Sequence, residues 1–271
     1  MKLRLHHINA FTDTLFKGNY AGVIFLDEWL STELMQAIAT ENNLSETAFV
    51  KHTGVNTYHI RWFSPLSEID FCGHATLASA YVLFKQNQAL KEIEFYAAAV
   101  GTLKARREAD GFIAMTFPLH MPQALSEIPA ALLGGLSIAP NEVLINRQAY
   151  FAIYANEADI HALKPRLEAL KKLAPYDVVV SAAASEYDFI SRYFWPATGG
   201  DEDPVTGSIH SGLAPFWAER LNKTQLVAYQ ASQRGGILHC RVEADAVVIS
   251  GQAVQYLEGD IEIYSAIAPT R

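Results

Sequence analysis

The chain carries little of what marks a disulfide-stabilised, metal-binding or membrane protein. Only two of its 271 residues are cysteines, Cys72 and Cys240, which are too few for a disulfide scaffold and lack metal-ligand spacing. The adjacent His6 and His7 would point to opposite faces of a strand, so they make a poor metal pair. No apolar run approaches the roughly 18 residues of a membrane span. These absences predict reduced thiols, no bound metal and no membrane contact.

Positive charge is also sparse. The formal net charge is −8, and no run of lysine and arginine is longer than a pair. Such a surface cannot neutralise a track of phosphates, which argues against nucleic acid as a partner. Half of the residues are hydrophobic and 18% are charged, as expected of a compact globule. His6, His7 and Asn9 interrupt any signal-peptide core, so we predict a cytoplasmic protein.

The first half is predicted to contain strands around one or two helices. Tyr58, Ile60 and Trp62 alternate with polar residues, as in a half-buried strand. Residues 31–42 predict a helix, capped by the serine with which it begins. Residues 74–85 are apolar almost all round, so a helix there must be buried on every side. We expect this helix in the middle of a wrapped sheet.

The second half repeats this theme. Four prolines and a Gly-Gly pair between Pro118 and Pro140 mark a domain boundary, which we place between residues 1–118 and 119–271. A helix is predicted from about Ser208 to Leu221, after a short glycine-containing loop like the one before residue 74. No letter-by-letter repeat is visible. We expect an α+β fold of two pseudo-symmetric halves, with a last strand at about 260–271 that returns to the first half.

Three segments place polar residues among apolar neighbours. They contain Glu46 in a predicted strand, Gly73 and His74 at the start of the buried helix, and Asp203 with Ser208 before the second helix. Taken singly, each has an ordinary structural explanation, such as an exposed strand edge or a helix cap. Taken together, two helix N-termini could clasp a substrate carboxylate across a cleft between the halves, with these side chains supplying proton transfer and hydrogen bonds.

At these residues the sequence closely resembles the PhzF-like family of phenazine biosynthesis. Five stretches, in the order of the family, carry the resemblance: Gly18-Asn19-Tyr20-Ala21-Gly22-Val23, Ser45-Glu46-Thr47-Ala48-Phe49, Arg61-Trp62-Phe63-Ser64-Pro65, Asp70-Phe71-Cys72-Gly73-His74-Ala75-Thr76-Leu77-Ala78 and Glu202-Asp203-Pro204-Val205-Thr206-Gly207-Ser208. A weaker sixth is Gly251 with Ala253-Val254. Tyr20 departs from the proline common in the family and affects only the local loop shape.

The resemblance implies a diaminopimelate-epimerase-like fold, in which each half wraps a mostly antiparallel sheet or barrel around a central helix. It also implies a cofactor-free isomerase, often homodimeric, that shifts a proton on a small carboxylate substrate. The catalytic roles fall on Glu46 as general acid/base, His74 and Asp203. Substrate binding falls on Gly73, Gly207 and Ser208, whose positions match the family's motifs.

Two rival functions remain. In the first, Cys72 resembles the first catalytic cysteine of proline racemases, enzymes of the same fold that use two thiols. The matching place in the second half is read as Val205, which cannot transfer a proton. In the second, the protein is a binding module that does not turn its ligand over. The presence of Glu46, His74, Asp203 and Ser208 together argues against it, since a binder does not need an acid/base.

Overall fold

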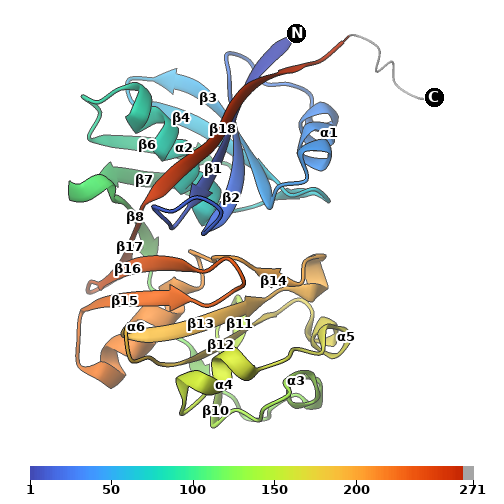
Figure 1. Cartoon of the computed structure of the whole chain (residues 1–271), viewed down its shortest axis with the longest axis vertical. Coiled ribbons are helices and arrows are strands. Elements are labelled where there is room, and N and C mark those ends of the chain that lie inside the picture. Colours follow the sequence, from blue (N-terminus) through green and yellow to red (C-terminus); the bar gives the residue numbers. More distant parts are fainter. Residues whose placement is uncertain (265–271) are drawn as a thin grey trace. The chain divides into compact units, whose positions relative to one another are not determined.

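Residues 1–264 are described by the computed structural model, which divides into two units (Figure 1). The N-terminal unit comprises Met1–Phe16, Tyr20–Ile113 and the segment that begins at Gln252. The C-terminal unit comprises Lys17–Asn19 and Ala114–Gly251. The chain thus passes between units at residues 113–114, a few residues before the expected boundary.

The N-terminal unit contains one mixed sheet. Its elements are β1 (Lys2–Ala10), β2 (Asn19–Leu26), α1 (Thr32–Asn42), β3 (Glu46–Gly54), β4 (Thr57–Phe63), β5 (Glu68–Ile69), α2 (Gly73–Gln86), β6 (Glu92–Ala97), β7 (Gly101–Arg107), the 3₁₀ turn η1 (Ala109–Gly111) and β18 (Ala253–Glu262). The strands lie in the order β18-β1-β2-β3-β4-β6-β7, and the short β5 also pairs with β4. The pairs β2–β3 and β4–β6 are parallel, since a helix connects the two strands of each pair. The expected returning strand overlaps only the end of β18, and residues 265–271 lie outside the described part.

The C-terminal unit has the same plan. Its elements are β8 (Ile113–Pro118), β9 (Gln123–Ala124), α3 (Ala130–Gly135), β10 (Glu142–Ile145), β11 (Ala149–Ile153), α4 (Glu157–Ala162), α5 (Leu167–Leu170), η2 (Lys171–Leu173), β12 (Asp177–Ala183), β13 (Phe189–Phe194), η3 (Pro196–Thr198), β14 (Glu202–Asp203), α6 (His210–Leu221), β15 (Gln225–Gln230), β16 (Gly236–Val242) and β17 (Ala246–Gly251). The order is β9-β10-β11-β12-β13-β15-β16-β17-β8, with β14 beside β13. Here β11–β12 and β13–β15 are the parallel pairs.

This shared topology confirms the expected α+β fold of two pseudo-symmetric halves. It also reveals a short repeated pattern, Arg-x-Phe-x-Pro, although the two copies are not identical letter by letter. Arg61-Trp62-Phe63-Ser64-Pro65 and Arg192-Tyr193-Phe194-Trp195-Pro196 both end the strand that precedes the central helix. In both units the phenylalanine of this motif pairs with a glutamate, Glu68 or Glu202, that binds the arginine.

The helix α2 is the centre of the N-terminal unit. Of its 14 residues only Tyr81, Lys85 and Gln86 are not buried, which confirms the expected helix that is buried all round. It contacts β1, β3, β7 and β18, so the sheet surrounds it. A helix with so little polar surface is stable here because every face packs on apolar side chains.

The helix α6 takes the same place in the C-terminal unit and contacts β15, β16 and β17. It begins at His210, two residues later than expected, because the preceding residues form tight turns in which His210 N–H donates to the Gly207 carbonyl. Pro215 lies inside the helix without ending it. Proline cannot donate to the Ser211 carbonyl one turn earlier, and the backbone N–H of His120 donates to it instead, over 3.0 Å.

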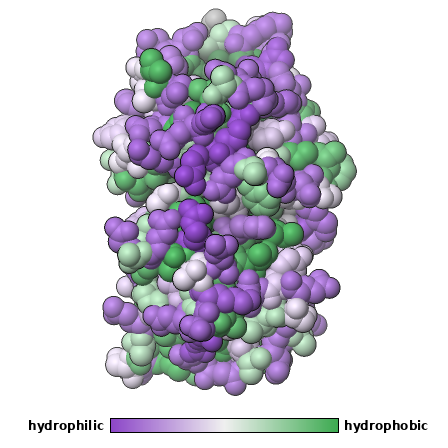
Figure 2. All heavy atoms as spheres, turned by 90° about the vertical axis from the view of Figure 1, so that its left-hand side faces the viewer, coloured by the Kyte–Doolittle hydropathy of each residue, from purple (hydrophilic) through white to green (hydrophobic). Residues whose placement is uncertain are grey.

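The surface agrees with the composition. Hydrophilic side chains cover much of the face shown in Figure 2, with hydrophobic ones dispersed among them. Among the residues that the structure describes, none of the helices has the length and apolar character needed to cross a membrane.

Candidate active site

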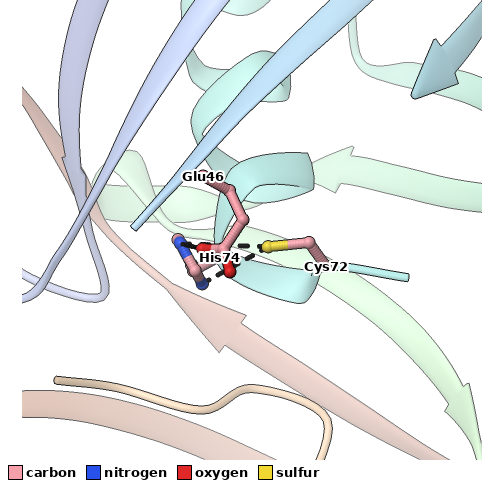
Figure 3. Close-up of side chains that lie close together, drawn as sticks. All are labelled: Glu46, Cys72 and His74. Carbon is pink, nitrogen blue, oxygen red and sulfur yellow. Dashed lines mark hydrogen bonds and ion pairs between the residues drawn. The ribbon is translucent and has the colours of Figure 1, made fainter. Parts of the chain in front are cut away.

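Two elements of the N-terminal unit bring Glu46 and His74 together. Glu46 is the first residue of β3, and His74 is the second residue of α2. His74 Nε2 lies 2.8 Å from Glu46 Oε2, and both side chains are more than 90% buried. The thiol of Cys72, the residue before α2, lies 3.5 Å from His74 Nδ1 (Figure 3). The site is therefore a compact carboxylate–imidazole–thiol group at the N-terminus of a buried helix.

The charges in this group follow from burial and proximity. Burial raises the pKa of the Cys72 thiol to about 11, although the nearby His74 opposes this change. Cys72 is therefore a neutral thiol near neutral pH. Burial by itself would lower the pKa of His74, but negative charge on Cys72 and Glu46 outweighs burial and raises it well above its usual value. The raised pKa favours the imidazolium form of His74, which lies beside Glu46.

The end of α2 that carries these groups favours negative charge. Cys72 caps the helix with its backbone only, since its side chain makes no capping hydrogen bond. Instead the hydroxyl and the amide of Thr76 both donate to the Cys72 carbonyl. His74 in the first turn, with its contact to Glu46, therefore lies at the positive end of the helix dipole.

Asp203 is held by hydrogen bonds in the C-terminal unit. One carboxylate oxygen accepts from Asn19 Nδ2 over 2.7 Å, and the other accepts from the Thr206 hydroxyl. The fully buried Gln230 donates to the Asp203 carbonyl and accepts from the Thr206 amide. The sequence did not predict Asn19 and Gln230 as members of this group, although Asn19 belongs to the family motif that begins at Gly18.

Ser208 belongs to a separate hydrogen-bonded chain. Its hydroxyl accepts from Gln148 Nε2 over 2.9 Å, and the same nitrogen donates to the Tyr193 hydroxyl over 3.0 Å. Tyr193 donates to Asp177 Oδ2 over 2.6 Å. The sequence reading did not identify Asp177, Tyr193 or Gln148. The available signal was an aspartate directly before the apolar run Val178-Val179-Val180, at the start of a strand as Glu46 is.

The repeat corrects the assignment of the residue that matches Cys72. Gly73 and Gly207 stand at equivalent places, which pairs Cys72 with Thr206 rather than with Val205. Local bonding agrees, because Thr76 Oγ1 donates to the Cys72 carbonyl and His210 Nδ1 contacts the Thr206 carbonyl over 2.8 Å. In this alignment Val205 lies one residue before the position that matches Cys72. A threonine hydroxyl is also no substitute for a second catalytic thiol.

The expected site residues therefore fall into two sets. The N-terminal unit brings Gly73, His74 and Glu46 together, and the C-terminal unit holds Asp203 and Ser208 in the two bonded groups above. Gly207 lies in the turn before α6. Within residues 1–264, the side chains that could jointly hold a metal ion are those of Glu46, Cys72 and His74, whose ligand atoms lie within 4.8 Å of one another. The expected absence of a metal stays a prediction.

Comparisons with known proteins agree with these motifs. Residues 8–259 match the family PhzC-PhzF, described as phenazine biosynthesis-like protein. An uncharacterized isomerase from Pseudomonas aeruginosa is 45% identical over 263 residues, covering 97% of this chain and all of the relative. A crystal structure of a PhzF-family phenazine biosynthesis protein from Enterococcus faecalis has a TM-score of 0.92 and 38% identity, covering 97% of this chain and all of that one.

The fold extends to more distant enzymes. A hydroxyproline epimerase from Agrobacterium vitis matches 96% of this chain and 92% of its own with a TM-score of 0.66, but with only 10% identity, so it shows the architecture alone. The PhzF-family matches, in contrast, cover nearly the whole sequence. The chain belongs to the phenazine biosynthesis-like (PhzF) family.

Proposed function

We propose that this protein is an isomerase that shifts a proton on a small carboxylate-bearing substrate, with Glu46 as general acid and base. The observation that carries the proposal is the 2.8 Å contact between the buried Glu46 carboxylate and His74 at the start of α2. A relative from Pseudomonas aeruginosa that is named an isomerase supports the reaction class.

One carboxyl group can perform the whole reaction. Ionised Glu46 removes a proton from a substrate carbon, the electron pair of the broken C–H bond shifts along the substrate, and protonated Glu46 returns the proton at another carbon. Enzyme and substrate together gain or lose no protons and no electrons, so no oxidant is needed. Cys72 and Glu46 raise the pKa of His74 against the effect of burial, so His74 places a positive charge beside the base.

We further propose that Gly73, Gly207 and Ser208 bind the substrate carboxylate and that Asp203 assists proton transfer. The first turn of α2 supports the role of Gly73, because helix N-termini favour anions. Ser208 is partly exposed, so its hydroxyl can be reached by a ligand. Asp203 is also partly exposed and is held in place by Asn19 and Thr206.

The function is tested by following solvent deuterium. Small carboxylates that raise the melting temperature of the protein would be incubated with it in D₂O and examined by NMR. We expect deuterium to enter a carbon-bound position of at least one of them, because the abstracted proton exchanges with solvent on Glu46. A ligand that binds tightly and never acquires deuterium would indicate the binding-module alternative instead.

Ser208 offers a prediction about binding. Ser208→Phe is expected to weaken binding of the carboxylate roughly tenfold or more, because one hydrogen bond to a charged group is lost and the side chain intrudes. Stability should change by about 1 kcal/mol or less, since Ser208 lies in a partly exposed turn. Titration calorimetry measures the first effect and urea unfolding the second. Ser126→Phe, at an exposed loop position of the same unit, is the control.

The contact between Cys72 and His74 favours one alternative, a cysteine-dependent racemase. We expect instead that Cys72→Ala and Cys72→Ser keep activity within about threefold, because the thiol is neutral and its equivalent in the C-terminal unit is Thr206. Cys240→Ala, at a buried thiol in β16, controls for packing loss. Complete inactivation of both Cys72 variants, with circular dichroism unchanged, would restore the racemase as the better explanation.

A further inference from the structure

The chain of hydrogen bonds that begins at Ser208 ends at the half-buried carboxyl group of Asp177. Asp177 Oδ2 accepts from Tyr193, and the Tyr193 hydroxyl and Ser208 hydroxyl both contact Gln148 Nε2. All four residues belong to the C-terminal unit. Asp177 is the first residue of β12, as Glu46 is the first residue of β3, and each pairs with an alanine in the neighbouring parallel strand.

The direction of each hydrogen bond in this chain is determined. The amide nitrogen of Gln148 has two protons and no acceptor capacity, so it donates one proton to Tyr193 and one to Ser208. The Tyr193 proton points to Asp177, which accepts it as a carboxylate. The Ser208 hydroxyl therefore accepts from Gln148 and keeps its own proton for another acceptor. A carboxylate at Asp177 thus makes Ser208 a donor.

An aspartate with a purely structural role would be expected to have hydrogen-bonding partners for both of its carboxylate oxygens. Asp177 Oδ1 is shielded from solvent and has no hydrogen-bonding partner, which is uncommon for a buried carboxylate. Burial raises the pKa of Asp177 to about 6, although the hydrogen bond from Tyr193 opposes this change. The folded protein therefore retains a partly unsatisfied negative charge near neutral pH, at a cost in stability. Such a cost is typical of residues kept for function.

We propose that Asp177 is a positioning residue for Ser208: through Tyr193 and Gln148 it holds the Ser208 hydroxyl as a hydrogen-bond donor to the anionic group of the substrate. This inference rests on the proposed role of Ser208 and deepens it. The class of ligand follows from the direction of the chain. A hydroxyl that presents its proton favours a carboxylate, which only accepts and is charged, over an uncharged amide, whose carbonyl is a weaker acceptor.

A double-mutant cycle tests the coupling, with benzoate as the anionic probe and benzamide as its uncharged counterpart. We expect Ser208→Ala to weaken benzoate binding roughly tenfold or more, and Asp177→Asn about three- to tenfold. The decisive value is the double variant, which should bind no more weakly than Ser208→Ala alone, because Asp177 acts only through Ser208. Benzamide binding should change less than benzoate binding in all three, because its carbonyl is an uncharged and weaker acceptor. Asp245→Asn, which removes an exposed charge from the same unit, is the control.

Three results would overturn the inference: additive losses in the double variant, benzoate affinity unchanged by Asp177→Asn, or no benzoate binding by the unmodified protein. Asp177→Asn is not expected to misfold. Because the pKa of Asp177 is raised in the folded protein to about 6, ionisation of this carboxyl group lowers the stability of the fold above that pH. Removing the charge should therefore not lower the melting temperature at pH 8. Tyr193→Phe interrupts the same chain and provides a second variant. Deuterium exchange dependent on Glu46 is measured separately, so failure of the proposed reaction and failure of this coupling are distinguishable.

Discussion

Glu46→Gln is expected to abolish turnover while the fold and carboxylate binding survive. Glutamine keeps the size of the side chain and part of its hydrogen bonding, but it cannot take up and return a proton. Loss of a general acid/base lowers kcat by about 10²-fold or more. The measurement is the rate at which solvent deuterium enters the substrate, with melting temperature and titration calorimetry on the same preparation.

Glu41→Gln is a matched control, because Glu41 is an exposed glutamate of α1. It should leave the rate of deuterium entry unchanged. If Glu46→Gln kept more than about a tenth of kcat, the change in barrier would be less than roughly 1.4 kcal/mol. Glu46 would then not be the acid/base, and the contact with His74 would be only a buried ion pair.

The second large effect concerns stability. Arg192 makes two bonds to Glu202, at 2.7 and 2.9 Å, and also donates to the backbone carbonyls of Ile160 and Leu163. Its side chain is only 13% exposed. Arg192→Leu would leave a shielded carboxylate and two carbonyls without their donor, so we expect a loss of about 3 kcal/mol in the free energy of unfolding, measured by urea denaturation.

The repeat supplies the control. Arg61 makes the equivalent pair with Glu68, but the two side chains are 28% and 38% exposed, and solvent can replace the lost partner. Arg61→Leu should therefore cost about 1 kcal/mol or less. Equal losses in the two variants would mean that burial does not determine the strength of this repeated ion pair.

The elements that the sequence predicted best are those with a local physical signature. The helix at residues 74–85 could be placed because its apolar residues leave no polar face, and α2 is buried as expected. Ser31 predicted the start of α1, and its hydroxyl does accept from the Leu34 amide. Glu46 and His74 were identified by motif, whereas their 2.8 Å contact required the parallel pairing of β2 with β3 and the position of α2.

What escaped prediction depends on register between distant strands. The repeated arginine motif is hidden because two residues separate Pro65 from Glu68, whereas five separate Pro196 from Glu202. Asp177 escaped for a related reason. A carboxylate before an apolar run usually lies at an exposed strand end, and only the pairing of β12 with β11 and β13 encloses it.

The pairing of β1 with β18 has a consequence for synthesis on the ribosome. It joins Lys2 to Glu262, so β1 lacks this neighbour until the chain through β18 has been synthesised. Apart from residues 17–19, the C-terminal unit is one continuous segment that is complete by Gly251. The N-terminal domain usually folds first during synthesis, whereas here the strand that completes the N-terminal sheet follows the whole C-terminal unit along the chain. We therefore expect β1 to present an open strand edge, a surface prone to aggregation, until β18 has been synthesised.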